Sequence, residues 1–296
     1  MNNKKSGDAN KYFKFAKHVF LFTAVILFFP NFVRIFICDQ FVVPSDSMEP
    51  TMIAGDRILV NKMVFGARIY KDFDFSDKAS LSSFRMPGTR GVHVNDVVVF
   101  NAPYGYSKKR ITFQINYVYS KRCIGTPGDS ISIKNGFFVN NRFPGIIGNE
   151  EQQRRLSETP DSLIYPKVLR AMPFNDQLFG WTIKNFGPLY IPQAGEKIKI
   201  DLCSYKLYRR VIEYETGLSM KQKETCVFLD GVPLDEYTFK KNYYFFCGDN
   251  VSNSKDSRYL GFVPEEFIIG IAQRISYSKN PQSGKKRLNR IWRKIS

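Results

Sequence analysis

The feature that most constrains this chain is an apolar stretch near its start. Between Lys17 and Asp39 lie 21 residues that carry one charge, Arg34, and the run from Val19 to Phe29 contains a single polar residue. Twenty-one helical residues at about 1.5 Å each span roughly 31 Å, which is one bilayer thickness. We therefore expect a membrane-spanning helix over residues 18–38.

The residues that flank this stretch favour an uncleaved anchor with a cytoplasmic N-terminus. Residues 1–17 carry five lysines and one acidic residue, and positive flanks stay in the cytoplasm. A cleavable signal peptide would end in small residues in an A-x-A-like pattern, whereas this stretch ends in RIFICDQF. A cleaved signal peptide and a buried core helix are the alternatives. With an anchor, the rest of the chain lies on the outer side of the membrane.

The net charge of +17 is concentrated at the two ends of the chain. Residues 273–296 hold eight cationic residues and no acidic one, and residues 1–17 hold much of the remaining excess. The long middle part is close to balanced, so it lacks the broad basic face that nucleic-acid binding requires. We expect no nucleic-acid partner.

The basic C-terminal tail has a helical pattern of apolar residues. Leu288, Ile291, Trp292 and Ile295 recur at helical spacing, with arginine and lysine at the positions between them. This pattern predicts an amphipathic helix within residues 276–296 that lies on a phospholipid membrane. A solvated tail and a last helix packed on the domain are the alternatives.

Most of the outer part has the pattern of β-strands. Asn135-Gly136 and Asp230-Gly231 are strong hairpin signals. Residues 145–225 are polar and irregular and show no long helical period, so they are interpreted as an inserted subdomain. The predicted strands lie within residues 57–60, 97–100, 130–140, 226–229, 243–247 and 267–272.

The scarcity of histidine limits the chemistry available. The chain has only His18, at the predicted membrane edge, and His93, in a polar stretch before a strand. A histidine-rich metal site is therefore excluded, and a hydrolase of the outer face needs another base. Lysine serves as a base when burial lowers its pKa by about 3 units from a reference near 10.4.

Five cysteines offer no metal-binding pattern. They include no C-x-x-C pair, so structural zinc is not expected, and an odd number leaves at least one thiol free. We expect no metal and no cofactor. The cysteines are Cys38, Cys123, Cys203, Cys226 and Cys247.

Three short clusters combine the residues that a Ser/Lys hydrolase needs. The first is PSDSMEPTM (44–52), the second is YSKRCIGTPGD (119–129) and the third is GDNVSNSKDSR (248–258). Each alone is equally typical of a turn-rich connection. In this order after one N-terminal anchor, they resemble the type I signal peptidases (leader peptidases) of bacteria. The resemblance covers the anchor, residues 41–62, roughly 90–142, and 226–272.

This resemblance implies a role for each matching residue. It implies that Ser47 is the nucleophile and Lys121 the general base. It also implies that Ser45 joins the Ser47 amide in the oxyanion hole and that Ser254 orients the lysine amine. The remaining implied residues are two supporting pairs, Asp256 with Arg258 and Asp249 with Arg122, and the substrate-channel residues Phe41, Val43 and Tyr119.

The implied fold is mostly β, with one transmembrane helix followed by a catalytic domain of two antiparallel sheets on the outer membrane surface. The expected organisation is a cytoplasmic segment (1–17), an anchor (18–38), a catalytic β domain (39–142 and 226–275), an inserted variable subdomain (143–225) and a basic amphipathic tail (276–296). The implied location is the bacterial inner membrane, and the implied partners are the signal peptides of preproteins with A-x-A-like cleavage sites.

The sequence departs from the family pattern near the implied site. Val251 and Ser252 replace a charged pair in the last motif, and Asp46 stands where a small residue is usual. Two other functions stay open. One is a dedicated processing protease for a few surface proteins, and the other is an inactive, membrane-tethered binding domain. The four implied residues Ser45, Ser47, Lys121 and Ser254 argue against the inactive domain.

Overall fold

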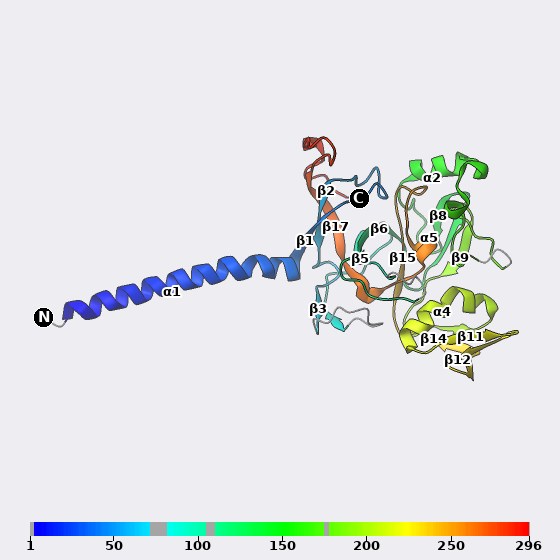
Figure 1. Ribbon diagram of the computed structural model, residues 1–296, viewed down its shortest axis with the longest axis horizontal. Helices are drawn as coiled ribbons and strands as arrows, with labels where there is room; N and C mark the ends of the chain where they lie inside the picture. Colours follow the sequence, from blue (N-terminus) through cyan, green and yellow to red (C-terminus); the bar gives the residue numbers. More distant parts are fainter. Residues whose placement is uncertain (1–2, 72–81, 105–109, 175–177, 296) are drawn as a thin grey trace.

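A long exposed helix leads from the N-terminus to a β-rich body (Figure 1). The computed structural model of the chain describes residues 3–71, 82–104, 110–174 and 178–295. Helix α1 (Asn3–Phe32) continues into a π-helical turn, Val33–Ile37. Within it, Phe13–Ile37 has a mean hydropathy of 2.1 and is not buried against the body. These 25 residues are long and apolar enough to cross a bilayer.

The body is built from several antiparallel sheets instead of the two that were expected. The main sheet has seven strands in the order β1-β2-β17-β5-β6-β15-β16. A second sheet has three strands, in the order β8-β7-β9. Further small sheets among the described residues are β3-β4, β10-β14 and β11-β12-β13. Parts of the predicted catalytic domain (72–81 and 105–109) and of the predicted insert (175–177) lie outside the described residues.

The elements have the following bounds. The strands of the main sheet are β1 (Cys38–Val42), β2 (Asp56–Asn61), β5 (Val97–Asn101), β6 (Val118–Gly125), β15 (Tyr243–Cys247), β16 (Val263–Pro264) and β17 (Ile268–Ser278). The other strands are β3 (Arg68–Tyr70), β4 (Ser83–Arg85), β7 (Ser130–Lys134), β8 (Phe137–Asn140), β9 (Phe186–Tyr190), β10 (Lys197–Lys199), β11 (Met220–Lys223), β12 (Cys226–Leu229), β13 (Val232–Pro233) and β14 (Glu236–Thr238). The helices of the body are α2 (Glu150–Glu158), α3 (Pro166–Leu169), α4 (Leu202–Thr216) and α5 (Ser257–Leu260), with short 3-10 turns at Asp161–Leu163, Glu265–Phe267 and Leu288–Arg290.

Strand β5 separates two hydrophobic cores. Side chains alternate between the faces of a strand, and all five residues of β5 are buried. Val97 and Val99 pack into a smaller core with the methionines of the 43–55 turn. Val98 and Phe100 pack into a larger core that extends toward β7 and α4. The main sheet is therefore covered on both faces, which holds its central strands rigidly.

The strand and hairpin predictions are confirmed. Both predicted turns adopt the left-handed backbone that such hairpins need, with φ of 49° at Asn135 and 48° at Asp230. Strand β17 extends further than the sequence predicted, to Ser278. The five cysteines are all free thiols.

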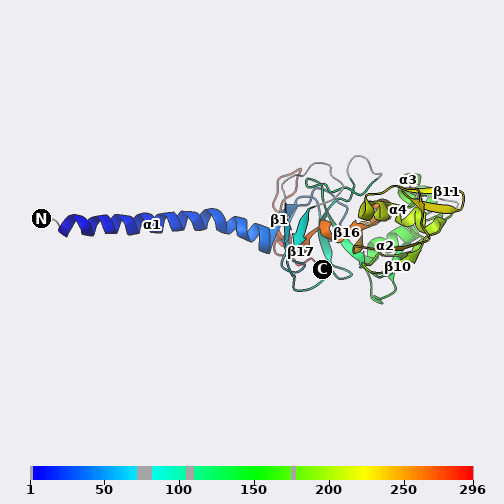
Figure 2. The same cartoon turned by 90° about the horizontal axis from the view of Figure 1, so that it is seen from below.

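The predicted insert contains a helix that the sequence analysis missed. α4 begins at an Asp201–Ser204 capping box and ends at Gly217 in the left-handed region. Its buried face includes Tyr205 and Tyr208 as well as aliphatic residues. Because tyrosine is only partly apolar, the helical spacing of apolar residues is hard to recognise in the sequence. The insert also supplies β9, which pairs with β7, so hydrogen bonds cross the expected domain boundary. Figure 2 shows α3 and α4 at the end of the body away from α1.

The predicted amphipathic helix at the C-terminus is wrong. The described part of the tail begins in β17, makes a short 3-10 turn at Leu288–Arg290 and folds back along β17. The amide of Trp292 donates to the carbonyl of Ile275 at 2.7 Å. Arg290 forms a buried ion pair with Asp56 at 2.6 Å. These tertiary contacts replace the helix, because they satisfy backbone groups and one buried charge together.

Candidate active site

A cleft in the main sheet gathers the residues of the first two motifs. It has a volume of about 350 Å³ and lies between β1, the 43–55 turn and β6. All three expected substrate-channel residues line it, Phe41 and Val43 from the β1 side and Tyr119 from β6. Ser47 and Lys121 line the same cleft. The structure therefore brings together residues that are more than 70 positions apart in the sequence.

The turn that carries Ser47 is pinned by two buried methionines. Met48 and Met52 are both at most 1% exposed, and they are joined by a Met52 N–H to Met48 carbonyl bond of 3.0 Å. The turn closes where the Val43 amide donates to the Asp56 carbonyl at 2.8 Å. Burial of these anchors holds Ser47, which is half-buried, at the cleft surface.

Strand β6 brings Lys121 to Ser47. The Lys121 Nζ is in hydrogen-bond contact with the Ser47 Oγ. Because Tyr119 and Lys121 are two residues apart in a strand, they share a face, and Nζ lies 5.9 Å from the tyrosine ring centroid. Lys121 is only 5% exposed. Burial lowers the pKa of Lys121. The nearby Asp256 carboxylate acts in the opposite direction, but the effect of burial is larger and the pKa stays below its usual value.

Ser45 lies beside Ser47 at the mouth of the cleft. The two Oγ atoms are 3.3 Å apart. Within the described chain, the Ser47 amide donates to no acceptor. A hydroxyl and a free amide on one turn are the donors that an oxyanion requires.

Behind the lysine, Asp256 and Arg258 form a fully buried ion pair. Both side chains are 0% exposed, with Nη2 and Oδ2 at 2.7 Å. Burial alone would raise the pKa of Asp256, but Arg258 and the Gly248 amide lower it below its usual value. Arg258 also donates to the Val251 carbonyl at 2.7 Å. The buried Val251 therefore takes part in the bracing through its backbone.

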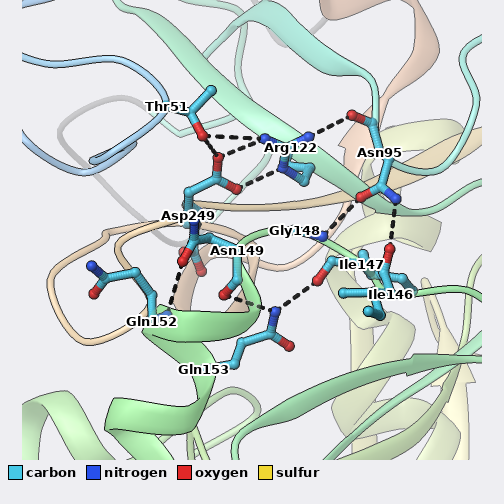
Figure 3. Close-up of polar contacts among 12 residues, drawn as sticks. Thr51, Asn95, Arg122, Ile146, Ile147, Gly148, Asn149, Gln152, Gln153 and Asp249 are labelled. Atoms are coloured by element: carbon cyan, nitrogen blue, oxygen red, sulfur yellow. Dashed lines mark hydrogen bonds and ion pairs between the residues drawn. The ribbon is translucent and has the colours of Figure 1, made fainter. Parts of the chain in front are cut away.

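A second ion pair joins the two motif segments to the third (Figure 3). Arg122 meets Asp249 through two bonds of 2.6 Å, from Nε to Oδ1 and from Nη2 to Oδ2. The Thr51 hydroxyl donates to Oδ2 of the same carboxylate at 2.5 Å. Since Arg122 follows Lys121 and Thr51 lies four residues after Ser47, one carboxylate ties the serine turn to the lysine strand.

The same network continues into the predicted insert (Figure 3). The Arg122 Nη1 donates to the Asn95 carbonyl, and the Asn95 side chain donates to the Ile146 carbonyl, both at 2.8 Å. The Gly148 amide returns a bond to the Asn95 Oδ1 at 2.8 Å. The side-chain amide of Gln153, in α2, donates to the Ile147 carbonyl at 2.7 Å. The segment before α2 is therefore fastened, through Asn95, to the Arg122–Asp249 ion pair.

Gly248 allows a close approach of the first and third motifs. A Cβ at this position would lie 2.3 Å from the Ser47 carbonyl oxygen and 2.2 Å from the Ser254 Oγ. Ser254 is buried, and its hydroxyl has no hydrogen-bond partner in the described part of the chain. The structure thus places Ser254 beside the site without the bond to Lys121 that the resemblance implied.

Asp46 is exposed, and it also contacts the third motif. Its carboxylate accepts a bond of 3.0 Å from Asn253, and its carbonyl accepts one of 3.2 Å from Asn250. The sequence did not predict these two contacts or the roles of Thr51 and Asn95. Asn250, Asn253 and Thr51 lie inside the quoted motifs. Asn95 lies outside them, in a stretch whose sequence indicated only a turn.

No group of three or more metal-ligating side chains comes together in the part of the chain that the structure describes. The cleft is instead a site of hydroxyl, amine and ion-pair chemistry. A serine hydroxyl in contact with a buried lysine amine is the arrangement that Ser/Lys hydrolases require.

The chain is similar to several known proteins. The sequence profile described as signal peptidase, peptidase S26, matches residues 14–277. A signal peptidase I of Buchnera aphidicola subsp. Schizaphis graminum is 30% identical, over 86% of this chain and 74% of its own length. A signal peptidase I of Aquifex aeolicus is 27% identical, over 83% and 78%. The crystal structure of a signal peptidase I from Enterococcus faecalis is 16% identical, covers 61% of this chain and 95% of its own, and has a TM-score of 0.30.

The profile match spans most of the chain, so the chain belongs to the signal peptidase I family, peptidase S26. Signal peptidase I is a serine endopeptidase that cleaves signal peptides from secreted preproteins. The sequence prediction of family and activity is confirmed.

Proposed function

We propose that Ser47 and Lys121 carry out the cleavage as nucleophile and general base. The observation that supports this most directly is the contact between the Ser47 Oγ and the Lys121 Nζ. Burial that lowers the lysine pKa raises the fraction of neutral amine at a given pH. A neutral amine accepts the serine proton, which a protonated one does not.

The proposed reaction proceeds through an acyl-enzyme. The Ser47 Oγ attacks the scissile carbonyl carbon while its proton passes to the Lys121 Nζ. Ser45 and the Ser47 amide stabilise the resulting oxyanion. Lys121 then protonates the leaving amine, and the mature protein departs. A water molecule then gives one proton to Lys121 and attacks the ester carbon. As the ester bond breaks, Lys121 returns that proton to the Ser47 Oγ, and the signal peptide leaves as a carboxylic acid that loses its proton to solvent.

The supporting groups would hold this geometry without taking part in proton transfer. Asp249 accepts bonds from Thr51 and Arg122, and thus links the two reacting segments. Asp256 and Arg258 would fix the third motif against the lysine. Ser254 would orient the amine once its side chain rotates toward Nζ, a role that its buried, unbonded hydroxyl leaves open.

The substrate is proposed to enter as an extended strand beside β1. Phe41 and Val43 line the cleft before Ser47, and Tyr119 lines it from β6. A strand added at a sheet edge gains main-chain bonds, while pockets for alternate side chains give specificity. The small cleft fits small side chains before the cut, as in an A-x-A-like site.

We further propose that α1 spans the inner membrane once, with residues 1–17 in the cytoplasm and the body outside. The length and hydropathy of Phe13–Ile37 support the span, and the lysine-rich flank supports the orientation. The outer location agrees with the established activity, because signal peptides are removed from exported chains.

Purified protein in detergent, incubated with a preprotein, tests the dyad. We compare the wild type with Ser47→Ala and Lys121→Ala, and use Lys221→Ala, an exposed residue of β11, as the matched control. Both site variants should lose cleavage, while the control keeps it. Equal cleavage by wild type and Ser47→Ala would refute the proposed dyad. Profiling the cleaved preproteins separates a general signal peptidase from a dedicated processing protease.

A further inference from the structure

A second cavity adjoins the candidate active-site cleft. It has a volume of about 420 Å³ and lies between α3, α4 and the loop 252–255. Asn253 and Lys255 line both cavities, whereas Phe41 and Val43 line only the first. The first cavity thus runs from β1 to this loop, and the second cavity continues beyond it.

The walls of the second cavity are aromatic and held in place. The Tyr259 Oη donates to the Val168 carbonyl at 2.6 Å, which fastens α5 to α3. The Arg210 guanidinium of α4 lies 5.2 Å from the centroid of the Tyr104 ring. Phe174, 51% exposed, lines the same cavity. The cavity therefore offers a preformed apolar surface to an extended peptide.

The described charged residues of this cavity are all cationic. Lys167, Arg210 and Lys255 line it, and none of its described lining residues is acidic. Lys167 and Lys255 form no ion pair with a described residue. Like charges that have no counterion among the described residues repel one another and attract an anion. A carboxylate brought in by the substrate would supply that anion.

We propose that the second cavity binds the first residues after the scissile bond and favours an acidic side chain there. The proposal rests on the proposed function, which places the signal peptide along β1. A peptide that follows β1 to Ser47 continues toward the loop 252–255, and its mature part then meets Lys255 and Lys167. An anionic lipid headgroup is the competing occupant. The position of α3 and α4 away from α1 favours the peptide (Figure 2).

Three peptides and one charge reversal test this subsite. The peptides share an A-x-A sequence before the cut and carry Asp, Ala or Lys at the second and third positions after it. The full chain in detergent should cleave the Asp peptide with a higher kcat/KM than the Lys peptide. Lys167→Glu should lower this Asp-to-Lys ratio about tenfold, because one exposed charge pair changes affinity by up to about fivefold in each direction. Lys167→Ala should shift the ratio the same way by less.

Lys221→Glu on β11 is the matched control, since it makes the same charge change outside both cavities. It should leave the ratio at the wild-type value. An unchanged ratio in Lys167→Glu would overturn the subsite. The subsite would also be overturned if Lys167→Glu lowered kcat/KM equally for all three peptides and did so only in the presence of phosphatidylglycerol vesicles. That result would assign the cationic side chains to lipid binding. Cleavage that survives Ser47→Ala would instead refute the proposed function, and with it the subsite.

Discussion

Replacement of Gly248 by alanine tests whether the contact between the first and third motifs sets the catalytic geometry. A Cβ there would lie 2.3 Å from the Ser47 carbonyl oxygen, and real contacts of this kind are not closer than 3.0 Å. The carbonyl is backbone, so the Ser47 turn must move by about 0.7 Å. The Ser254 hydroxyl, at 2.2 Å, can rotate away, but the Ser254 Cβ, at 2.6 Å, cannot. The displacement therefore falls on the turn of the proposed nucleophile and on the Ser254 backbone.

A misplacement of about 1 Å near reacting groups costs roughly 100-fold in rate. We expect Gly248→Ala to lower kcat 10- to 100-fold, and overpacking to cost about 1–3 kcal/mol of unfolding free energy. The assay is peptide cleavage in detergent together with thermal unfolding. Gly91→Ala is the matched control, because a Cβ at Gly91 meets no atom within 4 Å. Activity of Gly248→Ala within threefold of the wild type would refute the reasoning.

Three further predictions concern the lysine, the oxyanion donor and the C-terminal tail. Because burial lowers the pKa of Lys121 below 10.5, kcat/KM should rise with pH through that lowered pKa. Ser45→Ala should cost about 10²–10³ in kcat, which steady-state kinetics measures. Arg290→Ala should lower the unfolding free energy by about 3–5 kcal/mol in a denaturant titration, since it leaves the buried Asp56 carboxylate without its cation.

Each of these predictions has an outcome that contradicts it. A flat pH profile with chemistry limiting would argue against lysine as the base, and full activity of Ser45→Ala would remove that residue from the oxyanion site. Arg293→Ala, an exposed neighbour, is the control for the tail.

The pKa of Asp56 is lowered on folding, because hydrogen bonds and Arg290 together outweigh the effect of burial. Its contribution is therefore present above pH 3.8 and lost as pH falls through the folded pKa, and Arg290→Ala should reduce this acid sensitivity.

Local patterns predicted local structure well. The Asn-Gly and Asp-Gly turns formed the expected hairpins because left-handed backbone is a property of those residues themselves. Helix α4 was missed because tyrosines formed its buried face. The tail was expected to be helical because its period was real, yet the pairing of Trp292 with β17 and of Arg290 with Asp56 prevailed. A periodic pattern of apolar residues indicates a preference for helix, and contacts with residues distant in the sequence can outweigh that preference.

The sequence by itself determined the long apolar helix near the N-terminus, the order of the three motifs and the identity of the groups available for chemistry. Hydropathy, charge and residue type are properties of short segments, so they need no partner to be recognised. Only the tertiary structure decided that Thr51 and Arg122 share Asp249, that Gly248 must lack a side chain, and that a cationic cavity continues beyond the loop 252–255. These features join residues far apart in the chain, and their distances are set by how the sheet and its two cores pack.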